Sequence, residues 1–240
     1  MITFSPGGSP TPFWKRFAPL FGVGLLGIAA SVPLISRVVT SAVERTPAAP
    51  PIPLPALVAV SVAQTAALMA GAVAAGTAAA PGLGLRSHLA ERKPLIRALR
   101  PELPLALGLG AASGIALIAA DRAFQPWTGT ALLAVSQDQL APATTIWGVL
   151  ARLLYGGITE ELLLRWGLMS ALAWLMWRVL QRGRNQPRPA IVWTANITSA
   201  GLFGVGHIPA AAAFLTLSAP LVVQIVLVNS LAGIVFGWLF

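Results

Sequence analysis

The sequence predicts an all-α protein, a polytopic bundle of transmembrane helices with about six spans. Of the 240 residues, 56% are hydrophobic and 10% are charged, whereas a soluble domain usually carries about 25% charged residues. The mean hydropathy is +0.78. Several uncharged segments reach the roughly 20 residues that a helix needs to cross a bilayer. No series of short alternating segments indicates a β-barrel.

Six apolar segments are the expected spans, at residues 17–36, 55–80, 103–120, 142–180, 190–208 and 219–240. The first follows Lys15-Arg16, so a cleaved signal peptide is the alternative, but its length and the spans after it favour an uncleaved helix. The 142–180 segment would be about 58 Å long at about 1.5 Å per residue, nearly twice the thickness of the hydrocarbon core. We therefore expect it to break near Gly156-Gly157 or to project from the bilayer at one end.

Basic residues concentrate in two connections between these segments, at 85–104 and 178–189. Cytoplasmic connections of membrane proteins are rich in Lys and Arg, so both are expected in the cytoplasm, together with the N-terminus. Because the basic residues do not form one stripe, the net charge of +9 does not indicate a nucleic-acid partner. The chain has no cysteine, which excludes disulfides, thiolate metal sites and a cysteine nucleophile.

Two Gly-x-x-x-Gly patterns, Gly110/Gly114 and Gly233/Gly237, predict positions where helices approach closely, since small residues let backbones come together. We interpret both as packing notches within one molecule and not as dimer faces. The sequence shows no internal repeat of the kind that marks many transporters.

Three ionisable residues lie inside the long apolar segment, in the stretch GGITEELLLRWG. A carboxylate at the centre of a bilayer costs roughly 3 kcal/mol on insertion scales, so two adjacent ones need a reason. Glu161 and Arg165 are four residues apart, which is the spacing of a helix-surface ion pair. Glu160 points about 100° away around the helix and is left free to hold a proton or a water. The alternative is an ion pair plus a glutamate that reaches the interface.

The second candidate site is GLFGVGHIP, residues 201–209, where Phe203 and His207 share one helix face. His207 is the only histidine in an expected span, while His88 lies in a basic connection and is interpreted as solvated. A carboxylate and an imidazole together can activate a water; alone, His207 would be a satisfied histidine at a helix end. Asn196 shares the His207 face, and either lines the same cavity or makes an interhelical hydrogen bond.

Glu160-Glu161-x-x-x-Arg165, followed about forty residues later by Phe203-x-x-x-His207, resembles the CPBP family of intramembrane proteases, also called the CAAX protease and bacteriocin-processing family. The resemblance covers about residues 150–240. It implies hydrolysis of peptide bonds within the membrane, with Glu160 as general base on the attacking water and His207 sharing that water. Glu161 and Arg165 would orient the site, and Phe203 and Asn196 are counted as supporting residues.

The resemblance also sets the expected organisation. Residues 1–141 would supply N-terminal transmembrane helices and a basic cytoplasmic loop, and residues 142–240 the catalytic membrane region. With abundant alanine and far more arginine than lysine, the chain is expected in a bacterial inner membrane, acting on a peptide or protein substrate there. Eukaryotic relatives act on prenylated C-terminal motifs, and bacterial members are linked to peptide processing and bacteriocin immunity; the sequence does not choose between them.

No cofactor is expected. The family has been described both as metalloproteases and as metal-independent glutamate proteases. A catalytic zinc usually has three protein ligands and a water, and Glu160, Glu161 and His207 would be the ligands if the protein used a metal. We favour no metal.

One feature departs from the family pattern. Its third motif, a histidine with an asparagine four residues later, does not follow His207, and Asn229 lies too early to replace it. The chain would then be C-terminally truncated or a degenerate member. A non-catalytic membrane protein, or a small proton-coupled transporter, therefore stands as the alternative function.

Overall fold

The computed structural model describes residues 12–46, 52–91, 93–129 and 146–240, and these residues form helices and connections without a β-strand. The N-terminal helices are α1 (Phe13–Glu44), α2 (Leu54–Leu83), α3 (Leu95–Leu99) and α4 (Leu103–Thr128). The later elements are α6 (Ile146–Leu150), η1 (Ala151–Thr159), η2 (Leu162–Met169), α7 (Ser170–Leu180), α8 (Pro189–Gly206), α9 (Ile208–Ala212) and α10 (Ala219–Leu239). The all-α prediction is confirmed.

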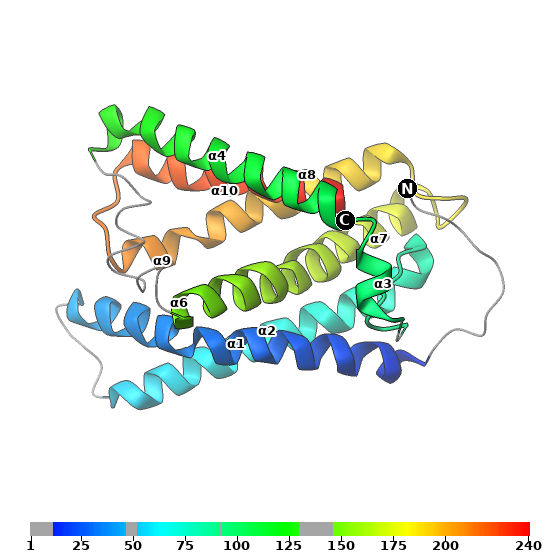
Figure 1. Ribbon diagram of the computed structural model, residues 1–240, viewed down its shortest axis with the longest axis horizontal. Helices are drawn as coiled ribbons and strands as arrows, with labels where there is room; N and C mark the ends of the chain where they lie inside the picture. Colours follow the sequence, from blue (N-terminus) through cyan, green and yellow to red (C-terminus); the bar gives the residue numbers. More distant parts are fainter. Residues whose placement is uncertain (1–11, 47–51, 92, 130–145) are drawn as a thin grey trace.

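The long elements lie side by side as a bundle (Figure 1). Four of the described helices, α1, α2, α4 and α10, are long and apolar enough to cross a membrane. The rod built from α6, η1, η2 and α7 and the helix α8 run alongside them, so each of the six expected segments corresponds to one rod. α1 packs on α2 and η1, α2 packs on η2 and α7, and α8 packs on α10 and η2.

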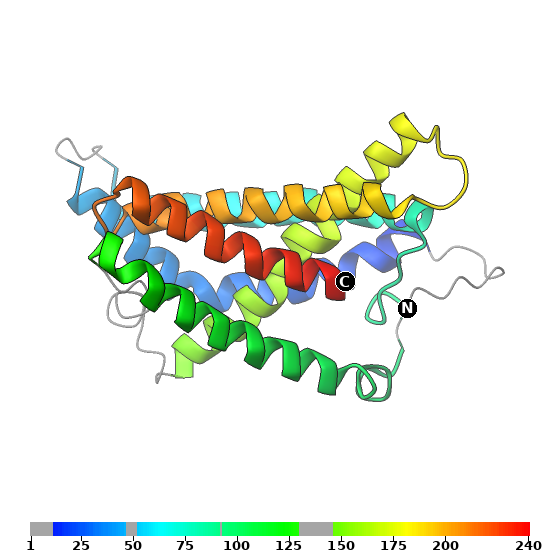
Figure 2. The same ribbon diagram turned by 90° about the horizontal axis from the view of Figure 1, so that it is seen from above.

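The rod from Ile146 to Leu180 does not break at Gly156-Gly157, so this part of the prediction is wrong. It widens instead. The Glu160 N–H donates to the Tyr155 carbonyl, and the Ser170 N–H to the Arg165 carbonyl, each five residues back. These are π-helical turns, which occur frequently at functional sites. The end of α7 stands clear of the neighbouring helices (Figure 2). Residues 142–145 lie outside the described ranges.

The two glycine patterns have different outcomes. A Cβ at Gly233 would meet Ala200, and one at Gly237 would meet Asn196, so α10 approaches α8 closely there. Gly110 and Gly114 have no such neighbour within 4 Å, and the predicted notch on α4 is therefore wrong for the described contacts. α4 lies at the edge of the bundle, and the only residue of this helix that is buried is Asp121, which accepts a hydrogen bond from Gln224 of α10 at 2.9 Å.

The two basic connections lie at the same end of the bundle (Figure 1). We call this the basic end; it holds the start of α1, α3, the end of α7 and the start of α8. The opposite end holds the ends of α1, α4 and α8 and the starts of α2, α6 and α10. This arrangement agrees with the expected alternation of the spans. Which end faces the cytoplasm stays a prediction.

The buried core lies toward the basic end. One cluster joins α1, α2 and η2 around Met69, Val73 and Trp166. A second joins α2, α7 and α8 around Leu83, Ala173 and other small or aliphatic residues. Met69 and Val73 are fully buried. The half of the bundle nearer the basic end is therefore closely packed between its helices.

Candidate active site

Arg165 ties the charged motif to two other helices. Its Nη1 lies 3.1 Å from Oε1 of Glu161, and its Nη2 donates to the Gly233 carbonyl of α10 at 3.0 Å. The guanidinium also lies over the rings of Phe203 and Phe236, 5.6 and 5.7 Å from their centroids. Arg165 is 3% exposed. The ion pair expected from the spacing is thus present, and its cation is fixed from three sides.

Thr159 fixes the position of the rod immediately before Glu160. Its hydroxyl donates to the Gly24 carbonyl of α1 at 3.0 Å, and the side chain is fully buried. The contact is possible because Gly27 has no side chain: a Cβ there would meet Thr159 Oγ1 and the Leu154 backbone. The small residues of α1 therefore bring that helix against η1 and hold the turn that carries Glu160.

His207 directly follows α8, and its ring is held by Phe203 one turn earlier. Nδ1 lies 2.8 Å from the Phe203 carbonyl oxygen, and the two rings meet edge to face with centroids 4.4 Å apart. A carbonyl oxygen only accepts hydrogen bonds, so Nδ1 carries the hydrogen. In the neutral imidazole Nε2 then keeps its lone pair and can accept a hydrogen bond from a water.

Glu160 and His207 line the same cavity, which has a volume of about 550 Å³. Its walls come from α1, α2, the long rod and α8. Most of the lining is apolar, with hydroxyls from Ser31, Ser61 and Tyr155. Within the described part of the chain the Glu160 carboxylate has neither a hydrogen bond nor an ion pair. The cavity thus brings together a carboxylate without a partner and an imidazole with a free acceptor nitrogen.

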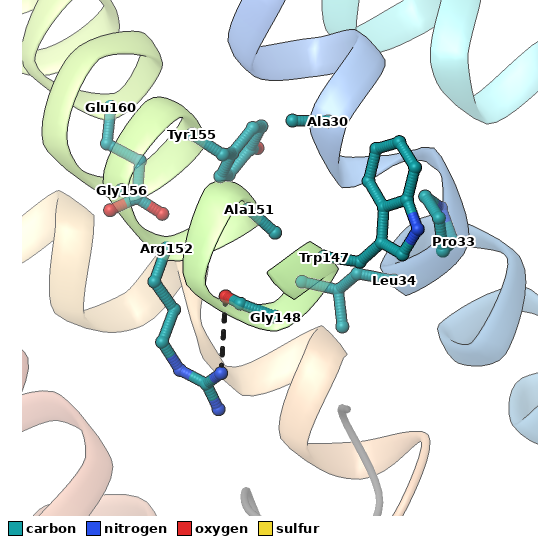
Figure 3. A pocket seen from close by; sticks show the side chains of 10 residues that line it. All are labelled: Ala30, Pro33, Leu34, Trp147, Gly148, Ala151, Arg152, Tyr155, Gly156 and Glu160. Carbon is teal, nitrogen blue, oxygen red and sulfur yellow. Dashed lines mark hydrogen bonds between the residues drawn. The ribbon is translucent and has the colours of Figure 1, made fainter. Parts of the chain in front are cut away.

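A second cavity of about 220 Å³ also reaches Glu160 (Figure 3). Arg152, Tyr155 and Trp147 contribute to its walls, and Tyr155 and Glu160 border both cavities. Arg152 donates to the Gly148 carbonyl at 3.3 Å. Sequence reasoning missed Arg152 and Tyr155. The signal for Tyr155 was available, because it is the only tyrosine in the chain and lies five residues before Glu160.

Asn196 makes an interhelical hydrogen bond. Its Nδ2 donates to the Ile234 carbonyl of α10 at 3.1 Å, and the side chain is buried against Gly237. It does not border the cavity that holds Glu160 and His207. Of the two expectations for Asn196, the structure shows the packing role. Asn229 donates within its own helix, to the Ile225 carbonyl at 2.8 Å.

The possible metal ligands do not converge. No group of three His, Cys, Asp or Glu residues in the described ranges lies close enough together to hold a metal ion. Glu161 faces Arg165, so the set of Glu160, Glu161 and His207 does not fit a zinc site with three protein ligands.

Comparison with known families addresses the same region. Residues 142–240 match the family model described as type II CAAX prenyl endopeptidase Rce1-like. This part of the chain is similar to the Rce1-like family. The resemblance to CPBP-type intramembrane proteases is thereby confirmed for this part of the chain. No curated protein and no solved structure is significantly similar to the chain.

The Rce1-like match supports a membrane-embedded endopeptidase, which is a hydrolase acting on peptides. It covers η1, η2, α8 and α10, and with them Glu160, Arg165 and His207. The helices α1 and α2 lie outside the matched region, yet they build two walls of the cavity. The Rce1-like region and the N-terminal helices therefore enclose the candidate site together.

Proposed function

We propose that this protein is an intramembrane endopeptidase in which Glu160 and His207 activate a water that attacks a peptide bond. The observation that carries the proposal is the shared cavity, which both the unpartnered carboxylate of Glu160 and the imidazole of His207 line. General acid–base catalysis needs both groups within hydrogen-bond reach of the reacting water. In this proposal the water is activated by the two side chains, without a metal or cofactor.

In the first step, Glu160 accepts a proton from the water while Nε2 of His207 accepts a hydrogen bond from the water's other O–H group. The water oxygen attacks the carbonyl carbon, and a tetrahedral intermediate with a negatively charged oxygen forms. Glu160 then gives its proton to the amide nitrogen, and the C–N bond breaks. The products are a carboxylic acid and an amine, and both side chains return to their starting states.

Glu161 and Arg165 support this chemistry without touching the water. Because Arg165 pairs with Glu161, the second carboxylate of the motif is not free to compete with Glu160 for the proton. The hydrogen bond from Arg165 to the Gly233 carbonyl and its contact with Phe203 join the rod to α10 and α8. Since His207 rests on Phe203, Arg165 also helps to fix the position of the imidazole.

The packing of the bundle favours hydrolysis over proton transport. A transporter needs a polar path from the site to both membrane faces. Between Glu160 and the basic end, Met169, Ala173, Ile191 and Ala195 are all nearly inaccessible and pack into one apolar cluster. Such a layer suits a site that is reached from one side.

Proteolysis by the purified protein in liposomes tests the proposal. We would follow cleavage of a library of apolar peptides by mass spectrometry and compare Glu160→Gln and His207→Gln with the unaltered protein. Removing a general base typically costs a factor of about 10² to 10⁴, so both variants should lose at least about 99% of the cleavage rate. Glu102→Gln and His88→Gln alter the same residue types at the basic end and are the matched controls. Equal cleavage by Glu160→Gln and the unaltered protein would contradict the proposed role of this carboxylate.

A further inference from the structure

Both cavities that contain Glu160 lie toward the end of the bundle opposite the basic connections. The smaller one is lined by Trp147 and Gly148 at the start of the long rod and by Pro33 and Leu34 in the second half of α1. The larger one reaches Ala210, beyond the end of α8. The open space around the carboxylate therefore extends away from the basic end.

The length of α8 gives the distance of His207 from the basic end. This helix starts at Pro189, next to the second basic connection, and its 18 residues end at Gly206, directly before His207. At about 1.5 Å per residue, His207 lies about 27 Å from the basic end, which approaches the thickness of the hydrocarbon core of a bilayer. His207 is consequently near the opposite membrane face.

A third cavity continues the path outward. It has a volume of about 760 Å³ and runs between α1, α2 and the α8–α9 corner. Its lining overlaps that of the Glu160–His207 cavity at Val38, Ser61 and Ala210, among others. It extends to Thr46, beyond the end of α1. We call these two overlapping cavities the entry groove. Its lining is mostly apolar, with polar side chains such as Gln64 and Thr65.

Close packing blocks access to the site from the basic end. Trp166, Met169 and Ala195 follow the site toward the basic end, and each is at most 6% exposed. The Trp166 indole N–H donates to Thr77 Oγ1 at 3.3 Å, and a Cβ at Gly76 would collide with the Trp166 backbone. A peptide could pass this layer only if α2 separated from η2. Interiors packed in this way do not open without a large cost.

Charge identifies the closed end. Most of the 16 Lys and Arg residues of the chain lie at the basic end or in its connections, including those in the two connections and Lys15 and Arg16. The opposite end carries few basic residues, and Glu44 and Asp121 offset part of their charge. An excess of Lys and Arg marks the cytoplasmic face of a membrane protein. The closed end is thus the expected cytoplasmic end.

We infer that the substrate is a peptide at the non-cytoplasmic face of the membrane, which enters through the groove between α1, α2 and the α8–α9 corner. The inference rests on the proposed function for the identity of the ligand as a peptide. The membrane face from which the peptide enters is inferred from the cavities and the charge distribution. It narrows the substrate class to exported peptides and to the outer segments of membrane proteins. The mostly apolar lining suits a peptide with apolar side chains, since ligand sites match the polarity of what they enclose.

The absence of cysteine from the chain makes the direction measurable. Three single-cysteine variants would be made. Thr46→Cys lies at the mouth of the entry groove and Ala210→Cys inside it, and Gln186→Cys lies in the second basic connection. The full-length protein would be expressed in a bacterial host. A charged, membrane-impermeant maleimide would then be applied to spheroplasts, which expose the outer face, and to inverted vesicles, which expose the cytoplasmic face.

We expect Thr46→Cys and Ala210→Cys to react at least about tenfold faster in spheroplasts than in inverted vesicles, and Gln186→Cys to show the reverse preference. Faster reaction of Thr46→Cys in inverted vesicles than in spheroplasts would overturn the inference. Reaction of Ala210→Cys in inverted vesicles alone would also overturn it. If Ala210→Cys does not accumulate in the membrane, Ser61→Cys is a nearly isosteric replacement in the same groove.

The labelling experiment also separates the two proposals, because labelling does not require catalysis. The expected labelling together with absent proteolysis would refute the proposed function alone, whereas active protein with reversed labelling would refute the direction alone.

Discussion

The Glu161 carboxylate lies 3.1 Å from Nη1 of Arg165, and the same guanidinium donates to the Gly233 carbonyl of another helix at 3.0 Å. One cation thereby neutralises an acid of the motif and fixes the rod against α10. The two functions can be separated by mutation, because a neutral residue at position 161 removes the acid but leaves the bond to Gly233.

Arg165→Gln should destabilise the protein, because it removes both the ion pair with Glu161 and the hydrogen bond to the Gly233 carbonyl. Losing one partner of a buried ion pair costs about 3–5 kcal/mol when the remaining charge is fully buried. The Glu161 side chain is 36% exposed, so we expect about 2 kcal/mol for Arg165→Gln. Thermal unfolding in detergent would measure this. The double variant should recover part of the loss, since it leaves no unpaired carboxylate. A double variant that is less stable than the sum of the single losses would show that the pair is not the source of the effect.

The short-range features of the site could be predicted from the sequence. The four-residue spacing of Glu161 and Arg165 predicts their contact because it follows from helix geometry alone. The spacing of Phe203 and His207 places both on one face for the same reason. The sequence could not show that Glu160 and His207 share a cavity, because 46 residues separate them and only packing brings their helices together. The family resemblance supplied that connection.

Other features depend on helix geometry that the sequence pattern does not carry. Tyr155 lies five residues before Glu160, and it borders the same cavities in a rod with π-helical turns. A regular period of 3.6 residues does not predict this register. Gly110 and Gly114 form the same pattern as Gly233 and Gly237, yet α4 lies at the edge of the bundle. The pattern permits a second helix to approach closely, but close approach occurs only where another helix packs against that face.

His207→Asn should separate the two ring nitrogens. The Asn amide can replace Nδ1 as the donor to the Phe203 carbonyl, but it is too short to place an acceptor at the position of Nε2. We expect His207→Asn to unfold at nearly the temperature of the unaltered protein, yet to lose at least about 99% of the cleavage rate, because no acceptor remains for the water. Cleavage by liposome-embedded protein and unfolding in detergent would be measured on the same preparations. An active His207→Asn variant would contradict the role given to Nε2.

Tyr155→Phe removes one hydroxyl from the boundary of both cavities. A hydroxyl beside the reacting carbonyl can stabilise the charge that develops on its oxygen, and loss of one such donor typically lowers kcat by a factor of about 10² to 10³. We expect a fall in kcat with little change in KM, which is the signature of an interaction made only in the transition state. Trp147→Phe alters another aromatic residue of the smaller cavity and serves as the control. If Tyr155→Phe raised KM and left kcat unchanged, the hydroxyl would contribute to substrate binding instead.

Gly27→Ala tests whether the approach of α1 holds the catalytic turn in place. A methyl group at this position would meet Thr159 Oγ1 and the backbone of Leu154, so α1 has to move away or Thr159 has to give up its bond to the Gly24 carbonyl. Overpacking of this kind costs about 1–3 kcal/mol. Because Thr159 directly precedes Glu160, we also expect a reduced cleavage rate.

The matched control lies on the same helix. Gly22 has no neighbour within 4 Å of an added Cβ, and alanine is the better helix former by about 1 kcal/mol. Gly22→Ala should therefore be neutral or slightly stabilising in thermal unfolding and fully active, while Gly27→Ala loses both stability and activity. Equal behaviour of the two variants would mean that α1 does not press on the turn before Glu160. The carboxylate would then owe its position to the bonds that Arg165 makes with Glu161 and Gly233.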